Sequence, residues 1–359
     1  MTTPNGLLVV RNLHKVFRVR SAASNGGGRR AGRKVELRAV DGVSLQVARG
    51  EILGVVGESG CGKSTLARMI VCLEEPTGGE VNFDGIDVLQ LSGQDLRALR
   101  KRFQIVFQDP YLSLNPRIKV GDALGEVLRV HAIGTKADRN DRVADLLRMV
   151  ELGDDLRARY PAHLSGGQRQ RVGIARALAA QPSLIVADEP VSSMDVSVQA
   201  QILNLIRRLR SELGVAWIFV GHDLSVVHYI ADRIAIMYLG RIVEEGPADL
   251  VFTSPLHPYT KGLIESAPKP DPRTKIPAAP LQGDPPSPIN IPAGCRFARR
   301  CPIARQFCLD HDPDLRSHEP AHTVACWAVT EPAAWERTEA LSARKAIQLQ
   351  PMQLAEDEA

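Results

Sequence analysis

The sequence contains no long hydrophobic run. A helix that spans a membrane needs about 18 to 20 consecutive apolar residues, and no stretch of the 359 residues approaches that length. The first residues also lack the basic, apolar and small-residue sections of a signal peptide. We therefore expect the protein to stay in the cytosol without crossing a membrane itself.

Neither sign of charge is in excess. Lys and Arg together number 45 against 41 for Asp and Glu, which gives a formal net charge of +4. This balance is too even to indicate nucleic-acid binding. The chain is also too long for one small core, and its length predicts about two or three domains.

Closely spaced cysteine pairs are missing as well. The last four of the six cysteines are separated by five, six and seventeen residues, whereas structural zinc sites commonly have about two to four residues between paired ligands. In a cytosolic protein, cysteines indicate metal binding or incidental thiols before disulfides. These four residues are Cys295, Cys301, Cys308 and Cys326.

Residues 52–70 predict a phosphate-binding loop. An apolar run at 52–56 is typical of a buried strand, and a glycine-rich stretch leads from it directly into a helix. In such a loop the backbone N–H groups cradle phosphates, Lys63 reaches the β- and γ-phosphates and Ser64 ligates Mg²⁺. We expect Cys61 to be a small filler and not a catalytic thiol. The residues expected to bind the nucleotide here are Gly57, Ser59, Gly60, Cys61, Gly62, Lys63, Ser64 and Thr65.

A second buried strand is expected to carry two carboxylates to the same edge of the sheet. The apolar residues 184–187 precede Asp188 and Glu189, and open α/β sheets bind ligands at the carboxyl ends of their strands. Asp188 is the expected metal-organising residue, and Glu189 is the candidate base that orients water toward the γ-phosphate.

Three further segments carry polar groups that could contact a ligand. Ser165, Gly166, Gly167 and Gln168 open a helix whose free N–H groups form an anion site. Gln108 follows one short apolar strand, and His222 follows another. Taken alone, such a Gln is ordinarily a surface residue, and such a His is more often structural than catalytic.

The octapeptide at 164–171, together with the phosphate-binding loop and the Asp-Glu pair, resembles the ATP-binding-cassette (ABC) ATPases. The resemblance implies an α/β fold: a P-loop (RecA-like) core, an antiparallel β-subdomain, a helical subdomain and a small Cys-containing C-terminal extension. It also implies that Gln108 lies at the Mg²⁺, that His222 is the switch histidine and that Phe17 stacks on adenine, although a simple core Phe fits position 17 nearly as well. In the family, residues 165–168 complete the ATP site of a second subunit.

The expected domain organisation follows the same resemblance. An ATPase domain covers residues 1–250, with a helical subdomain at about 93–165. A C-terminal extension with the cysteines covers 251–335, and 336–359 form a flexible tail. Residues 21–33, rich in Gly and Arg, have nothing to bury and are expected to form a solvated hairpin loop.

Several segments resemble the ATPase subunits of bacterial dipeptide and oligopeptide importers. They are residues 107–117, 195–201 and 255–260. The D-loop has Ser193 and Met194 where Ala-Leu is usual. The implied function is ATP hydrolysis that energises peptide import. Alternatives are an importer ATPase for another small solute, such as nickel or glutathione, and a soluble ABC ATPase acting on ribosomes or DNA.

The resemblance also implies partners and a location. They are a second ABC ATPase subunit, two membrane permease subunits and an extracytoplasmic peptide-binding protein, with no nucleic acid. The chain itself would lie peripherally on the cytoplasmic face of the cell membrane. A regulatory cassette without hydrolysis conflicts with the presence of Lys63, Asp188, Glu189 and His222.

The four late cysteines leave the metal open on chemistry alone. Arg296, Arg299, Arg300 and Arg305 lie among the first three of them and would favour thiolates for zinc and for an iron–sulfur cluster alike. Because some peptide-importer ATPases carry a [4Fe–4S] cluster in this extension, the resemblance favours that cluster over zinc or no metal. Its expected role is structural.

Overall fold

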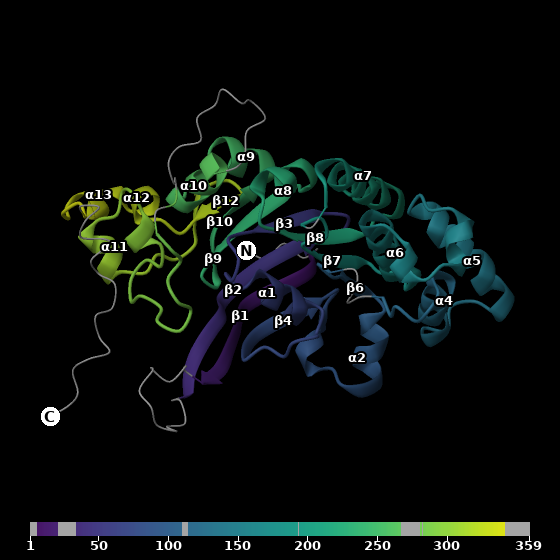
Figure 1. The fold of residues 1–359 in the computed structure, drawn as a ribbon. Coiled ribbons are helices and arrows are strands. Elements are labelled where there is room, and N and C mark those ends of the chain that lie inside the picture. The colour runs from purple at the N-terminus through teal and green to yellow at the C-terminus, as the bar shows by residue number, and fades with distance from the viewer. Residues whose placement is uncertain are drawn as a thin grey trace, which may run out of the picture.

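The computed structural model describes residues 6–20, 34–109, 114–192, 194–266, 281 and 283–341 (Figure 1). The Gly/Arg loop expected at 21–33 lies outside the described residues, as do Ser193 and most of the expected tail. In the described part of the chain, no helix is long and apolar enough to cross a bilayer.

The main sheet has eight strands in the order β11-β12-β10-β9-β3-β8-β7-β6. Strands β6, β7, β8, β3 and β9 run parallel, and β10, β12 and β11 continue the sheet in antiparallel pairs. Every residue of β3, β7 and β8 is buried, which explains their uninterrupted apolar sequences. The strands are β3 (Ile52–Val56), β6 (Phe103–Val106), β7 (Leu184–Asp188), β8 (Ala216–Gly221), β9 (Arg233–Tyr238), β10 (Arg241–Pro247), β11 (Arg316–Glu319) and β12 (His322–Val324).

A second, antiparallel sheet has the order β2-β1-β4-β5. Its strands are β1 (Gly6–Arg20), β2 (Lys34–Ala48), β4 (Gly78–Phe83) and β5 (Ile86–Asp87). This sheet confirms the expected antiparallel β-subdomain.

Helices cover both faces of the main sheet. In Figure 1, α7, α8 and α9 lie along one face, and α1 lies between the two sheets. The α-helices are α1 (Lys63–Ile70), α2 (Gly93–Arg100), α4 (Val120–Val130), α5 (Lys136–Met149), α6 (Gly166–Ala179), α7 (Val196–Leu213), α8 (Leu224–Ile230), α9 (Ala248–Thr253), α10 (Pro258–Ser266), α11 (Gln306–Asp310), α12 (Trp327–Thr330) and α13 (Pro332–Glu336). Short 3₁₀ turns lie at Val88–Gln90, Asp154–Ala158, Pro161–His163 and Ala298–Arg300.

Alternating residues of β3 divide the core in two. Ile52 and Val56 belong to a cluster formed with the helices α4 to α8. Leu53 and Val55 belong to a second cluster, formed with α1 and the antiparallel sheet. Successive side chains of a strand point to opposite faces, so β3 packs against both hydrophobic clusters. This packing fixes the position at which the loop after β3 begins.

The helices α4, α5 and α6 form one compact group at an edge of the molecule (Figure 1). They follow β6, which pairs in parallel with β7. The range 93–165 expected for the helical subdomain therefore includes one strand of the main sheet. The residues between β6 and β7 are the part that departs from the sheet.

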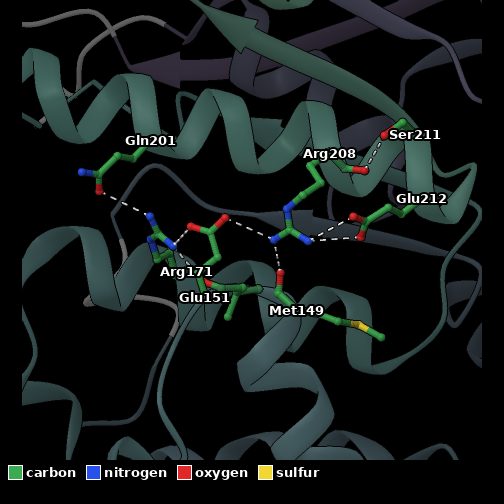
Figure 2. A network of polar contacts seen from close by, with 8 residues as sticks. Met149, Glu151, Arg171, Gln201, Arg208, Ser211 and Glu212 are labelled. Atoms are coloured by element: carbon green, nitrogen blue, oxygen red, sulfur yellow. Dashed lines mark hydrogen bonds and ion pairs between the residues drawn. The ribbon is translucent and has the colours of Figure 1, made fainter.

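A polar network joins this helical group to α7 (Figure 2). The Glu151 carboxylate accepts from Arg171 of α6 at 2.5 Å and from Arg208 of α7 at 3.3 Å. Arg208 also donates to the Met149 carbonyl at 2.7 Å, and Arg171 donates to Gln201 at 3.3 Å. The helix that begins at the signature sequence is therefore fixed to both of its neighbours.

The C-terminal extension is continuous with the main sheet. Strand β12 pairs with β10, and β11 pairs with β12. Part of the expected flexible tail is also ordered, because Leu341 donates to the Ala304 carbonyl at 3.0 Å and Gln306 donates to the Glu339 carbonyl at 3.0 Å. The structure describes no tail residue after Leu341.

Candidate functional site

The phosphate-binding loop connects β3 to α1, as its sequence predicts. Two of its glycines are required by their neighbours: a Cβ at Gly57 would lie 2.1 Å from the Met237 carbonyl oxygen, and one at Gly62 would lie 2.1 Å from that of Ala39. Gly62 also has a φ of 105°, which favours glycine. No side chain caps α1, so the loop and the start of the helix present backbone N–H groups to an anion.

Lys63 lies inside the loop and is 4% exposed. Its ammonium donates to the carbonyl oxygens of Gly57 at 2.7 Å and Glu58 at 3.0 Å. The loop backbone thus satisfies this buried charge, and phosphate oxygens are better acceptors for it than neutral carbonyls. Cys61 is buried beside it, and burial raises the pKa of its thiol, as fits a neutral filler.

Ser64 and Asp188 meet across the site. The Ser64 hydroxyl donates to Asp188 Oδ1 at 2.9 Å, although Ser64 lies in α1 and Asp188 ends β7. Burial raises the pKa of the Asp188 carboxyl, against the lowering effect of that hydrogen bond. A hydroxyl and a carboxylate at this distance match the oxygen ligands that Mg²⁺ prefers.

Glu189 brings together the two polar residues that follow neighbouring strands. Its Oε2 accepts from Gln108 Nε2 at 3.1 Å and lies 3.3 Å from His222 Nδ1. Glu189 has a φ of 47°, which is uncommon for any residue other than glycine. This backbone turn directly after β7 takes Glu189 out of the line of the strand.

A cavity of about 50 Å³ lies next to this group and is lined in part by Glu189, Ser192 and His222. A volume of this size with polar walls accommodates a water molecule. Ser192 also accepts from Gln108 at 3.5 Å. Ser192 belongs to the segment 190–195 that resembles the family's D-loop, but it was not among the predicted site residues, because a serine in a turn carries no distinctive pattern of its own.

The signature residues lie at the start of α6. Ser165 is its N-cap and forms a capping box with Gln168: Gln168 N–H donates to Ser165 Oγ at 3.2 Å, and Ser165 N–H donates to Gln168 Oε1 at 3.0 Å. Ser165 and Gly166 are exposed. A Cβ at Gly167 would lie 2.7 Å from Val198 of α7, so close packing accounts for that glycine.

The remaining predicted nucleotide residues lie on the loop surface, in α1 and in β1. Ser59 and Gly60 are exposed, and Thr65 is half-buried in α1. Phe17 is half-buried on β1, with the Lys15 ammonium 4.9 Å from its ring centroid. Adenine stacking by Phe17 stays a prediction, as do the individual roles of the other site residues.

The four late cysteines line one small pocket, together with residues that include Trp327 and Trp335. All four are free thiols. Burial raises the pKa of Cys295 and Cys326, and that of Cys301 to about 12. Within the described residues, however, no group of three or more His, Cys, Asp or Glu is placed to hold a metal ion. The expected metal and iron–sulfur cluster therefore gain no support from the structure.

The arginines near these cysteines make other contacts than expected. Arg296 pairs with Asp41, and Arg300 pairs with Glu58. Arg305 donates to two backbone carbonyls and lies over the Trp335 ring. These three arginines thus have partners outside the cysteine pocket, and the expectation that they favour thiolates stays a prediction.

Family models match two parts of this chain. One, described as ABC transporter, matches residues 40–192. The other, described as oligopeptide/dipeptide transporter, C-terminal region, matches residues 243–308. The first match contains the phosphate-binding loop, the signature and the two carboxylates, and the second contains three of the four late cysteines.

Whole-chain relatives and a solved structure agree with these matches. A putative peptide import ATP-binding protein of Brucella ovis is 47% identical over 324 residues, which is 90% of this chain and 98% of the relative. The oligopeptide transport ATP-binding protein AppF of Bacillus subtilis is 45% identical over 324 residues, 89% of this chain and 96% of AppF. The dimeric ATP-binding cassette MJ0796, bound to ADP and phosphate after hydrolysis, superimposes with a TM-score of 0.58 at 31% identity, covering 67% of this chain and 98% of MJ0796.

Proposed function

The chain belongs to the ABC transporter ATP-binding subunits of the dipeptide and oligopeptide importer family, and from this premise we propose that it hydrolyses ATP to drive peptide import across the cell membrane. The observation that carries the proposal is one site in which Lys63, the Ser64–Asp188 pair and Glu189 converge. This site belongs to a chain whose residues 243–308 match the C-terminal region of oligopeptide and dipeptide transporters.

Each residue of the site has a role in this proposal. Lys63 exchanges its loop carbonyls for the β- and γ-phosphates of ATP. Ser64, Asp188 and Gln108 hold Mg²⁺, which when bound neutralises phosphate charge. Glu189 accepts a proton from the attacking water, and His222, 3.3 Å from the same carboxylate oxygen, keeps it oriented.

The subunit partners follow from the family and from the exposed α6 N-terminus. Membrane permease subunits are implied by membership of an importer family. The finer composition is part of the proposal: two permeases, an extracytoplasmic peptide-binding protein and a second ATPase subunit whose nucleotide contacts residues 165–168. The chain would then lie on the cytoplasmic face of the membrane. Nickel, glutathione or another small solute is the alternative cargo, since specificity in such systems resides in other polypeptides.

The experiment is peptide uptake by cells that carry either the wild-type chain or Glu189→Gln. The amide cannot accept the proton, so hydrolysis by the purified variant should fall by about 100-fold or more. ATP binding should persist, because Lys63 and Asp188 are unchanged. Labelled peptide uptake should stop, and both proteins should co-purify with permease subunits.

A strain that lacks the chain, together with the two purified proteins, separates the alternatives. If cells without the chain still take up peptide normally but lose nickel or glutathione uptake, the imported solute is nickel or glutathione and not a peptide. A chain that co-purifies with ribosomes and never with permeases would contradict the importer function. Hydrolysis by Glu189→Gln within about threefold of wild type would assign the base elsewhere.

We also propose that the four late cysteines hold a [4Fe–4S] cluster, which requires four thiolate ligands. The proposal rests on the match of residues 243–308 to the C-terminal region of oligopeptide and dipeptide transporters and on the four cysteines lining one pocket. Cys295, Cys301, Cys308 and Cys326 would supply the four thiolates, and the cluster would have a structural role. Zinc is the alternative.

Anaerobic purification of the full chain tests the cluster. We expect a brown protein whose visible absorbance and iron content disappear together in the Cys301→Ser, Cys308→Ser double variant. Cys72→Ser is the matched control, because Cys72 lies outside the pocket, and it should retain both signals. A colourless wild-type preparation, with or without one zinc per chain, would contradict the proposal.

A further inference from the structure

The C-terminal extension contacts the phosphate-binding loop directly at Glu58. Both terminal nitrogens of Arg300 donate to the Glu58 carboxylate, at 2.7 and 2.8 Å. The Glu58 N–H donates to the hydroxyl of Tyr259, which lies in α10, at 2.8 Å. Glu58 is therefore held through its side chain and its backbone by two residues that follow the ATPase core in the sequence.

The two residues that hold Glu58 are themselves fixed. Tyr259 is completely buried, and its ring centroid lies 4.7 Å from that of Tyr238 and 5.5 Å from that of Phe297. Arg300 is buried and also donates to the Tyr238 hydroxyl at 3.3 Å. A bidentate pair that starts from such a rigid base has a defined geometry.

The backbone carbonyl of Glu58 contacts Lys63, the lysine expected to bind the phosphates. The Glu58 carbonyl accepts from Lys63 at 3.0 Å. Glu58 thus contacts Tyr259 through its N–H, Arg300 through its carboxylate and Lys63 through its carbonyl. A rotation of Glu58 would therefore displace the backbone of the phosphate-binding loop.

We propose that Arg300 and Tyr259 are positioning residues for ATP: they hold the phosphate-binding loop in its nucleotide-binding conformation through Glu58, so that ATP affinity depends on the C-terminal extension. Neither residue touches the nucleotide in this proposal. Their effect arises because a pre-organised loop does not have to be ordered when the phosphates bind. The proposal concerns the nucleotide site and is independent of which solute is imported.

The test measures the Kd of Mg-ATP for the full-length chain by calorimetry. Arg300→Gln should weaken binding by about tenfold, because a charged bidentate contact is lost. Glu58→Gln should have a similar effect, and the double variant should be no weaker than either single variant, since both remove the same contact. Arg300→Lys should recover part of the affinity, because it restores one charged donor.

Arg299→Gln is the matched control, because it removes the same charge one position away from the contact with Glu58; its Kd should stay within about twofold of wild type. Tyr259→Phe removes only the hydroxyl and keeps the ring packing, so it tests the second contact if Arg300→Gln does not fold. Thermal melting of each variant separates folding from binding. A melting temperature that falls while the Kd of Arg300→Gln or Tyr259→Phe stays at the wild-type value would overturn the proposal, as would additive losses in the double variant.

Discussion

Glu189 has an uncommon backbone conformation at the position expected to provide the base. Its φ of 47° costs of order 1 kcal/mol for a residue with a Cβ. Its N–H donates to the Val220 carbonyl at 3.0 Å, so the turn stays hydrogen-bonded to β8. The carboxylate reaches Gln108 and His222 from this turn, and we infer that the strain is tolerated because it places the carboxylate there.

Single residues of the site were predictable where a short motif carries the chemistry. The sequence predicted Lys63, Ser64 and Asp188, and the structure brings Ser64 and Asp188 to 2.9 Å. Glu58 was not predicted, although it lies inside the same motif. Its role depends on Arg300, 242 positions away, and a pair at that separation leaves no local pattern in one sequence.

The N-terminus of the signature helix α6 is both capped and exposed. The capping box satisfies N–H groups of both Ser165 and Gln168, while Gly166 has open space around it. The polar network around Glu151 and Arg171 holds the helix to its neighbours (Figure 2). A rigid helix with an accessible positive end is suited to receive phosphate from another molecule.

This arrangement predicts the effect of Ser165→Arg on assembly. In a Glu189→Gln background, Mg-ATP should drive association with the second ATPase subunit, because ATP is retained. Ser165→Arg should block this association by adding bulk and a cation at the helix N-terminus. Light scattering with and without Mg-ATP measures the mass of each species.

Ser165→Ala is the control for this experiment. It removes the cap, at a cost of about 1 kcal/mol in helix stability, but adds neither bulk nor charge. The Ala variant should therefore still associate. Association of Ser165→Arg to the same extent as its parent would contradict the sandwich arrangement.

At the scale of elements, strands were predictable in proportion to their burial. The sequences of β3, β7 and β8 are fully buried and therefore read as apolar runs. By contrast, all four residues of β11 are exposed, and β12 has three residues. Neither carries a periodic apolar pattern, so the continuation of the main sheet into the extension was missed.

At the scale of the molecule, buried polar groups hold the extension against the core. The completely buried Glu244 of β10 accepts from the N–H groups of Leu256 and His257 at 2.8 and 2.9 Å, and lies 2.8 Å from His322 of β12. Arg296 pairs with Asp41 of β2 and donates to the Leu239 carbonyl at 2.5 Å. These contacts hold the extension against both sheets. A separate domain joined only by a linker would not need such buried polar contacts with the core.

The Asp41–Arg296 pair predicts a pH-dependent contribution to stability. Burial acts to raise the pKa of Asp41, but the hydrogen bond and charge of Arg296, together with the charges of Arg241 and Arg38, outweigh it and hold that pKa below the usual value. Asp41→Asn leaves a buried guanidinium without its counter-charge, so we expect the free energy of unfolding at pH 7 to fall by about 3 kcal/mol. Urea unfolding of both proteins measures this difference.

The sign of the pH effect follows from the direction of the shift. Because the folded pKa lies below the unfolded value of about 3.9, the wild-type advantage is complete above about pH 5 and is lost as pH falls through the folded pKa. Glu80→Gln is the control, since its pair with Arg11 is more than half exposed on both sides, at 64% and 53%, and should contribute under about 1 kcal/mol at any pH. The difference in free energy of unfolding between wild type and Asp41→Asn could instead stay constant from pH 7 down to the lowest pH at which the protein folds. That result would show that the variant loses packing and not an ion pair, and that this ion pair does not hold the extension in place.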